Sequence, residues 1–150
     1  MTFLIDLTEK RFKTPANQAV IDFIRRVNPY AHSDLGLKLI ELGKAIGGTH
    51  YHCPAFSSYA YVVLHTESNV IFAIAFGMRD IAFRLPVGGV RSALAQGFAQ
   101  SSEIGKEWLC VNPFPAGGPT AEVEAQLRSL CTRAFRYAMA EGDYLRKENS

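Results

Sequence analysis

The stretch Phe56–Pro86, FSSYAYVVLHTESNVIFAIAFGMRDIAFRLP, decides the fold class. It holds three runs rich in aromatic and β-branched residues, which are Tyr59–His65, Val70–Phe76 and Ile81–Leu85. Two clusters of turn-forming residues separate these runs, Thr66–Asn69 and Gly77–Asp80. Short apolar runs bounded by such clusters predict three antiparallel strands joined by tight turns.

Helical patterns lie on both sides of this meander. We expect helices over Pro15–Val27 after an N-cap at Thr14, over Ser33–Ile46, over Val90–Phe98, and from the cap residue Thr120 to Gly142. The alternating segment Glu107–Asn112 predicts a fourth strand, with Trp108, Cys110 and Asn112 on one face and Leu109 and Val111 on the other. Together these elements predict an α+β, two-layer domain: an antiparallel four-stranded sheet, a meander plus one strand, covered by helices on one face. We expect its other face to carry the polar and aromatic residues that contact solvent or a partner.

The domain boundaries follow from the same patterns. Residues 1–14 are expected to form a solvated N-terminal arm, although Phe3–Ile5 also suits a short strand or an arm packed on the body. Residues 15–142 form a single α+β domain, and residues 143–150 form a polar tail.

Composition limits the classes of protein that need consideration. The chain has 150 residues, of which 48% are hydrophobic and 20% charged, so it can bury one sizeable core. No apolar run reaches the roughly 18 residues that a membrane span needs, and the start lacks the pattern of a signal peptide. Three cysteines without CxxC spacing indicate reduced thiols. We therefore expect a cytoplasmic protein with no membrane partner.

The segment His50-Tyr51-His52-Cys53 contains the most ligand-like cluster. In an extended chain His50 and His52 point to one side and Cys53 to the other, so the three side chains do not converge on one metal ion. The same geometry separates a cysteine nucleophile from a histidine base. We expect no metal, no cofactor and no catalytic residues.

Basic residues around the predicted sheet suggest a binding surface. Arg79 lies in a turn, Arg84 on the third strand, Arg91 in the short helix and Lys106 before the fourth strand. Exposed Arg and Lys side chains contact phosphates, and Trp108 offers a ring on which a base can stack. The alternative is that these arginines are scattered, solvated and paired with Glu103, Glu107 and Asp80.

The hairpin Val70–Phe76, turn, Ile81–Pro86 resembles that of the TfoX N-terminal domain and the related YjbR/MmcQ-like domains. The resemblance covers residues 35–140 and includes the order of the later elements. The glycine-rich stretch that precedes the hairpin in that family has no clear counterpart, since Pro54–Tyr59 stands there, and the first helix is extra. The resemblance implies a non-enzymatic domain of a type linked to regulation of competence or to DNA binding.

Three hypotheses about function follow. The first is a regulatory domain that contacts nucleic acid or a regulatory protein through Arg79, Arg84, Arg91, Lys106 and Trp108. The second is a protein-interaction domain that forms a homodimer and has no ligand chemistry. The third is a metal or thiol enzyme that uses His50, His52 and Cys53.

Overall fold

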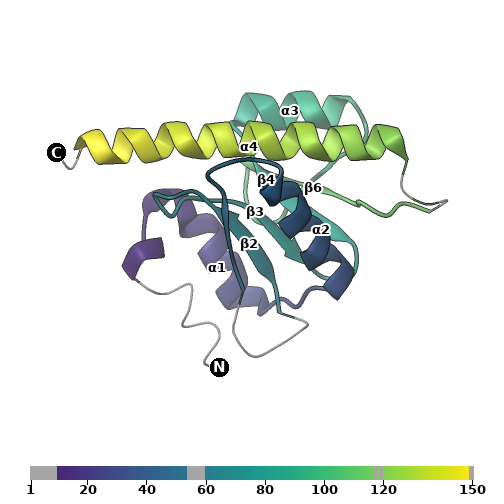
Figure 1. Ribbon diagram of the computed structural model, residues 1–150, viewed down its shortest axis with the longest axis horizontal. Coiled ribbons are helices and arrows are strands. Elements are labelled where there is room, and N and C mark those ends of the chain that lie inside the picture. The colour runs from purple at the N-terminus through teal and green to yellow at the C-terminus, as the bar shows by residue number, and fades with distance from the viewer. Residues whose placement is uncertain (1–9, 54–59, 117, 119, 149–150) are drawn as a thin grey trace.

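The computed structural model of the protein describes residues 10–53, 60–116, 118 and 120–148 (Figure 1). Four α-helices and a six-stranded antiparallel sheet make up this part of the chain, so the α+β class is confirmed. The helices are α1 (Gln18–Val27), α2 (Ser33–Lys44), α3 (Val87–Ala95) and α4 (Ala121–Glu148), and two 3-10 turns, η3 (Lys10–Phe12) and η4 (Pro15–Asn17), precede them. The strands are β1 (His50–His52), β2 (Val62–His65), β3 (Ile71–Phe76), β4 (Asp80–Arg84), β5 (Gln100–Ser101) and β6 (Trp108–Val111).

The sheet has the strand order β1-β2-β3-β4-β6-β5. The predicted meander is present as β2, β3 and β4, and the predicted fourth strand is β6, which pairs with β4. The predicted start of the first strand at Tyr59 lies outside the described residues. The count of four strands is wrong, because β1 and β5 add one short strand at each edge. Strands of three and two residues are too short to show an alternating pattern, and they form only because β2 and β6 offer them an edge.

Both faces of the sheet are covered, so the two-layer arrangement with one polar face is also wrong. Residues of α2, α3 and α4 pack on one face, and α1 packs on the other together with Phe12 (Figure 1). The sequence carried a signal for this, because Ile71–Phe76 is apolar at every position. In the structure all four residues of β2 and the first five of β3 are buried. Strands that are apolar on consecutive positions need cover on both faces.

A β-bulge shifts the register between β2 and β3. Leu64 pairs with Ala73, but the next residue, His65, pairs with Ile71, so Phe72 is an extra residue on β3. Phe72 and Ala73 consequently both join the core under α2 and α4. The bulge adds an aromatic side chain to that core.

The two ends of the domain differ from the predicted boundaries. Phe12 in η3 is fully buried, so the expectation of a solvated arm is wrong for this residue, whereas its neighbours Lys10, Arg11 and Lys13 are exposed. Residues 1–9 lie outside the described part. At the other end, α4 does not stop at Gly142 but continues through residue 148. A Cβ at Gly142 would lie 2.9 Å from Ser68 Oγ. Gly142 therefore allows close packing on the β2–β3 turn and does not end the helix.

Within the described residues, no helix is long and apolar enough to cross a membrane. The prediction of a cytoplasmic location stays a prediction.

Candidate functional site

Arg84, expected on an exposed surface, is only 4% exposed. Its Nη2 atom lies 3.1 Å from Glu107 Oε1 and 2.8 Å from Glu141 Oε1, and its guanidinium lies over the Tyr137 ring. Burial lowers the pKa of Arg84, but the hydrogen bond to Glu141 and the charges of Glu141 and Glu107 outweigh burial and raise the pKa. Arg84 thus pairs with Glu107, which agrees with the alternative that the basic residues pair with nearby carboxylates. The pair is buried on the arginine side, however, so a phosphate group cannot reach the guanidinium directly.

The other members of the basic set do not share one surface. Trp108 is 1% exposed and belongs to the core under α1, so its ring cannot stack on a base. Arg79, Arg91 and Lys106 are exposed. In the β4–β6 pairing, Ile81 lies opposite Val111 and Arg84 opposite Trp108. Arg79 and Lys106 therefore lie beyond opposite ends of these paired strands, which alone span roughly 10 Å from Ile81 to Arg84 at about 3.3 Å per residue.

Three histidines gather on the face of the sheet that α1 covers. His50 stacks on His65 with ring centroids 5.6 Å apart, and Phe12 contacts both His52 and His65. Burial lowers the pKa of His65, and the charges of Arg11, His50 and His52 add to this effect, whereas a hydrogen bond with the Thr66 carbonyl opposes it. In the described part of the chain, no group of three His, Cys, Asp or Glu side chains could hold a metal ion.

Two of the three thiols lie in environments that disfavour the reactive thiolate. Burial raises the pKa of Cys110 to about 11 and that of Cys131 to about 12. Cys53, the thiol named in the enzyme hypothesis, is exposed directly after β1.

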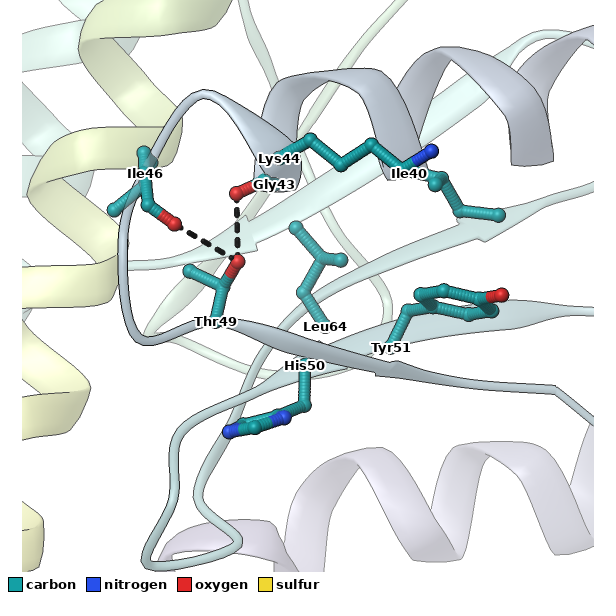
Figure 2. A pocket seen from close by; sticks show the side chains of 8 residues that line it. All are labelled: Ile40, Gly43, Lys44, Ile46, Thr49, His50, Tyr51 and Leu64. Carbon is teal, nitrogen blue, oxygen red and sulfur yellow. Dashed lines mark hydrogen bonds between the residues drawn. The ribbon is translucent and has the colours of Figure 1, made fainter.

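A groove of about 350 Å³ lies between α2 and the edge strand β1 (Figure 2). Its lining comes from α2, from the α2–β1 connection and from β1 and β2: Ile40, Gly43, Lys44, Ile46, Thr49, His50, Tyr51 and Leu64. Figure 2 shows the Leu64 and Tyr51 side chains on the side of the sheet that faces α2, whereas the His50 ring points to the opposite side. The register explains this, because Tyr51 pairs with Leu64 and His50 with His65.

Local contacts set the width of this groove. Gly43 packs so closely on β2 that a Cβ there would lie 2.9 Å from Leu64 Cδ2. The Thr49 hydroxyl lies 2.6 Å from the Gly43 carbonyl oxygen and 3.1 Å from that of Ile46, and its single proton is donated to one of them. These contacts hold the end of α2 against the start of β1 (Figure 2). The floor is therefore a fixed apolar surface.

The rim of the groove is exposed and chemically distinct from its floor. Tyr51 is 54% exposed, and the exposed Lys44, in the last turn of α2, makes no ion pair with a described residue. One edge of β1 pairs with β2, and no described strand pairs with the other edge. The groove thus combines an apolar floor, a cation and an edge strand. Such an arrangement can hold an extended chain that carries an apolar side chain and a carboxylate.

Sequence reasoning missed this site because it assigned no strand to the residues between the expected helix Ser33–Ile46 and the meander. The available signal was the run Thr49–His52, in which a β-branched and an aromatic residue follow the Gly47–Gly48 pair.

Comparison of the chain with protein-family models, with curated proteins and with solved structures gave no match in any of the three. The resemblance to the TfoX N-terminal and YjbR/MmcQ-like domains consequently stays a prediction, as does the function that it implies.

Proposed function

We propose that this chain is a non-enzymatic binding domain that takes an extended segment of a partner protein in the groove between α2 and β1. The observation that carries the proposal is the position of the groove, which an edge strand borders on one side and a helix on the other. A peptide that adds to a sheet edge gains backbone hydrogen bonds there, and a neighbouring pocket selects its side chains.

The chemistry of the groove defines the segment. A peptide paired with β1 directs alternate side chains toward α2, as Tyr51 and Leu64 do. One such side chain reaches the apolar floor formed by Ile40, Ile46 and Leu64. The ammonium group of Lys44 at the rim favours an acidic residue next to this apolar one. We therefore propose a segment that is extended, with an apolar anchor and an adjacent carboxylate.

The positions of the basic and aromatic side chains favour a protein segment over nucleic acid as the ligand. Burial of Arg84 and Trp108 removes one cation and the only tryptophan ring from the expected nucleic-acid surface. The remaining cations, Arg79, Arg91 and Lys106, do not form one phosphate-binding stripe, because Arg79 and Lys106 lie at opposite ends of β4 and β6. The net charge of +2 adds little attraction for a polyanion.

Panning of a random 12-residue peptide display library against the full chain tests the proposal. Enriched peptides are expected to share an apolar position beside an acidic one and to bind in fluorescence anisotropy. The Ile40→Arg variant should weaken this binding at least tenfold, because arginine fills the apolar floor. Leu37→Arg is the matched control: Leu37 is on the same helix and 65% exposed, but it does not line the groove.

Other outcomes contradict the proposal. Library panning without enrichment, or equal binding by Ile40→Arg and the unmodified chain, would exclude the groove as a peptide site. A dimer in light scattering that Ile40→Arg dissociates would assign the groove to a second copy of this chain. If labelled duplex DNA binds, if this binding weakens steeply with salt and if no peptide binds, the result would contradict the peptide proposal and support a nucleic-acid-binding function.

A further inference from the structure

A second cleft, of about 270 Å³, lies near the other edge of the sheet. The β3–β4 turn, the ends of β5 and β6, and the first turns of α4 surround it. In the strand order, β1 and β5 are the two outermost strands, so this cleft is separate from the groove beside β1. Its volume falls just below the range of about 300–1,000 Å³ that drug-sized ligands occupy, which suits a smaller molecule.

Two opposite charges line this cleft without pairing. Arg79 and Asp80 are neighbours in the chain and both line it. Burial raises the pKa of Asp80, and the nearby positive charge of Arg79 opposes this increase to a smaller extent. Neither side chain forms a salt bridge or a hydrogen bond with another described residue. A guanidinium and a carboxyl group are thus both available to a ligand.

Three side-chain amides complete the polar part of the lining: Gln100, Asn112 and Gln126. The backbone N–H of Phe114 donates to Asn112 Oδ1 at 2.9 Å, which fixes the orientation of that amide. The amide nitrogen of Asn112 remains available as a donor, since no described residue accepts from it. The cleft therefore offers donors and acceptors around a pair of opposite charges.

Apolar side chains form the rest of the wall. Phe98, between α3 and β5, and Val123, on α4, are both partly buried against the core and line the cleft. Such a wall can hold the carbon skeleton of a small molecule while the polar groups orient its charged ends.

We propose that this cleft binds a small zwitterion of the α-amino acid type, with the ligand carboxylate at Arg79 and the ligand ammonium group at Asp80. A guanidinium binds a carboxylate through two parallel hydrogen bonds, and a carboxylate accepts hydrogen bonds from an ammonium group. A simple anion or cation would satisfy one of the two charges and would leave the other unpaired. The proposal does not depend on the function assigned to the groove beside β1.

The experiment uses the twenty free L-amino acids, each at millimolar concentration, in a thermal-shift screen of the full chain followed by titration calorimetry. At least one amino acid is expected to raise the melting temperature and to bind. Its methyl ester, which lacks the carboxylate charge, and its N-acetyl derivative, which lacks the ammonium charge, should each bind at least tenfold more weakly. This comparison uses the unmodified protein, so it does not depend on the folding of any variant.

Variants then locate the site. Arg79→Gln and Asp80→Asn should each weaken binding at least tenfold, whereas Arg91→Gln, which changes an exposed arginine outside the cleft, should leave it unchanged. Failure of all twenty amino acids to bind would overturn the proposal. Equal binding of the N-acetyl derivative would also overturn it, because the cleft would then be a site for anions. Binding that neither Arg79→Gln nor Asp80→Asn changes would place the ligand elsewhere and reject this site.

Discussion

The guanidinium of Arg84 on β4 lies 2.8 Å from the carboxylate of Glu141 on α4, 57 residues further along the chain. Glu107, just before β6, accepts a second hydrogen bond from Arg84 and one from the Tyr137 hydroxyl. One buried cation thus joins the middle of the sheet, the entry to β6 and the last part of α4. The pairing replaces the hydration that each of these charges loses on burial.

We predict that Arg84→Ala lowers the free energy of unfolding by about 3 kcal/mol, because it leaves two carboxylates without their partner and removes a packed side chain. Urea denaturation measures this loss. Arg91→Ala, at an exposed position on α3, should change stability by less than about 0.5 kcal/mol. A loss below about 1 kcal/mol for Arg84→Ala would mean that the cluster behaves as an ordinary surface ion pair.

Asn17 is a second buried polar connection. Its Nδ2 donates to the carbonyl oxygens of Phe12 and Asn69 at 2.9 and 2.8 Å, and its Oδ1 accepts from the backbone N–H of Ile71 at 2.8 Å. Asn17→Ala should lower the free energy of unfolding by about 2–3 kcal/mol, because buried backbone groups lose their partner. Thermal and urea denaturation test this prediction, with the exposed neighbour Gln18→Ala as control. Equal stability of the two variants would show that water replaces the amide without cost.

Substitution of Gly142 tests whether close packing on Ser68 or helix propensity has the larger effect on stability at this position. Gly142→Ala should lower the free energy of unfolding by about 1–2 kcal/mol, since the new methyl group would lie 2.9 Å from Ser68 Oγ. In a Ser68→Gly background the same change should stabilise the protein by up to about 1 kcal/mol, because alanine favours helix more than glycine does. Urea denaturation of the unmodified chain, the two single variants and the double variant gives the coupling free energy between residues 68 and 142. Additive effects would contradict the packing explanation.

His65 should make stability depend on pH. Its pKa is lowered in the folded protein from the ordinary 6.5, mainly by burial, so the unfolded chain binds this proton more readily. The contribution of His65 to stability is therefore fully present above about pH 6.5 and is lost as the pH falls through the lowered pKa.

His65→Gln removes this titration, and its amide can still donate to the Thr66 carbonyl that His65 now contacts. The free energy of unfolding, measured by urea denaturation from about pH 7 to pH 5, should fall less steeply for the variant than for the unmodified chain. Identical slopes would assign the acid sensitivity to other groups.

Local sequence patterns predicted most of the helices and strands, but not which helices cover each face of the sheet. The apolar runs of β2, β3 and β4 and the alternation of Trp108 with Leu109 were read correctly, because strand periodicity depends on neighbours within a few residues. The helix layer on the second face of the sheet was not predicted, although the continuous apolar run Val70–Phe76 already indicated burial on both faces. Which helix covers which face depends on contacts between segments far apart in the chain.

The candidate sites show the same division. Arg84 was expected at the surface because arginine is charged. It can be buried because Glu107, just before β6, and Glu141, on α4, pair with it. The groove beside β1 was not predicted, since a three-residue strand has no periodic signal and exists only through its pairing with β2. Arg79 and Asp80 were assigned to a turn, but the cleft around them forms only when β6 and α4 pack beside that turn.

The sequence by itself determined the α+β class, the antiparallel meander, the presence and order of the four α-helices and the faces of β6. These features follow from turn residues, helix caps and hydrophobic periodicity, whose energies act over a few residues. Tertiary structure alone decided the edge strands, the cover of the second face, the burial of Arg84 and the two clefts. Each of these depends on groups distant in sequence that meet only when the chain folds, and desolvation and pairing then set their energies.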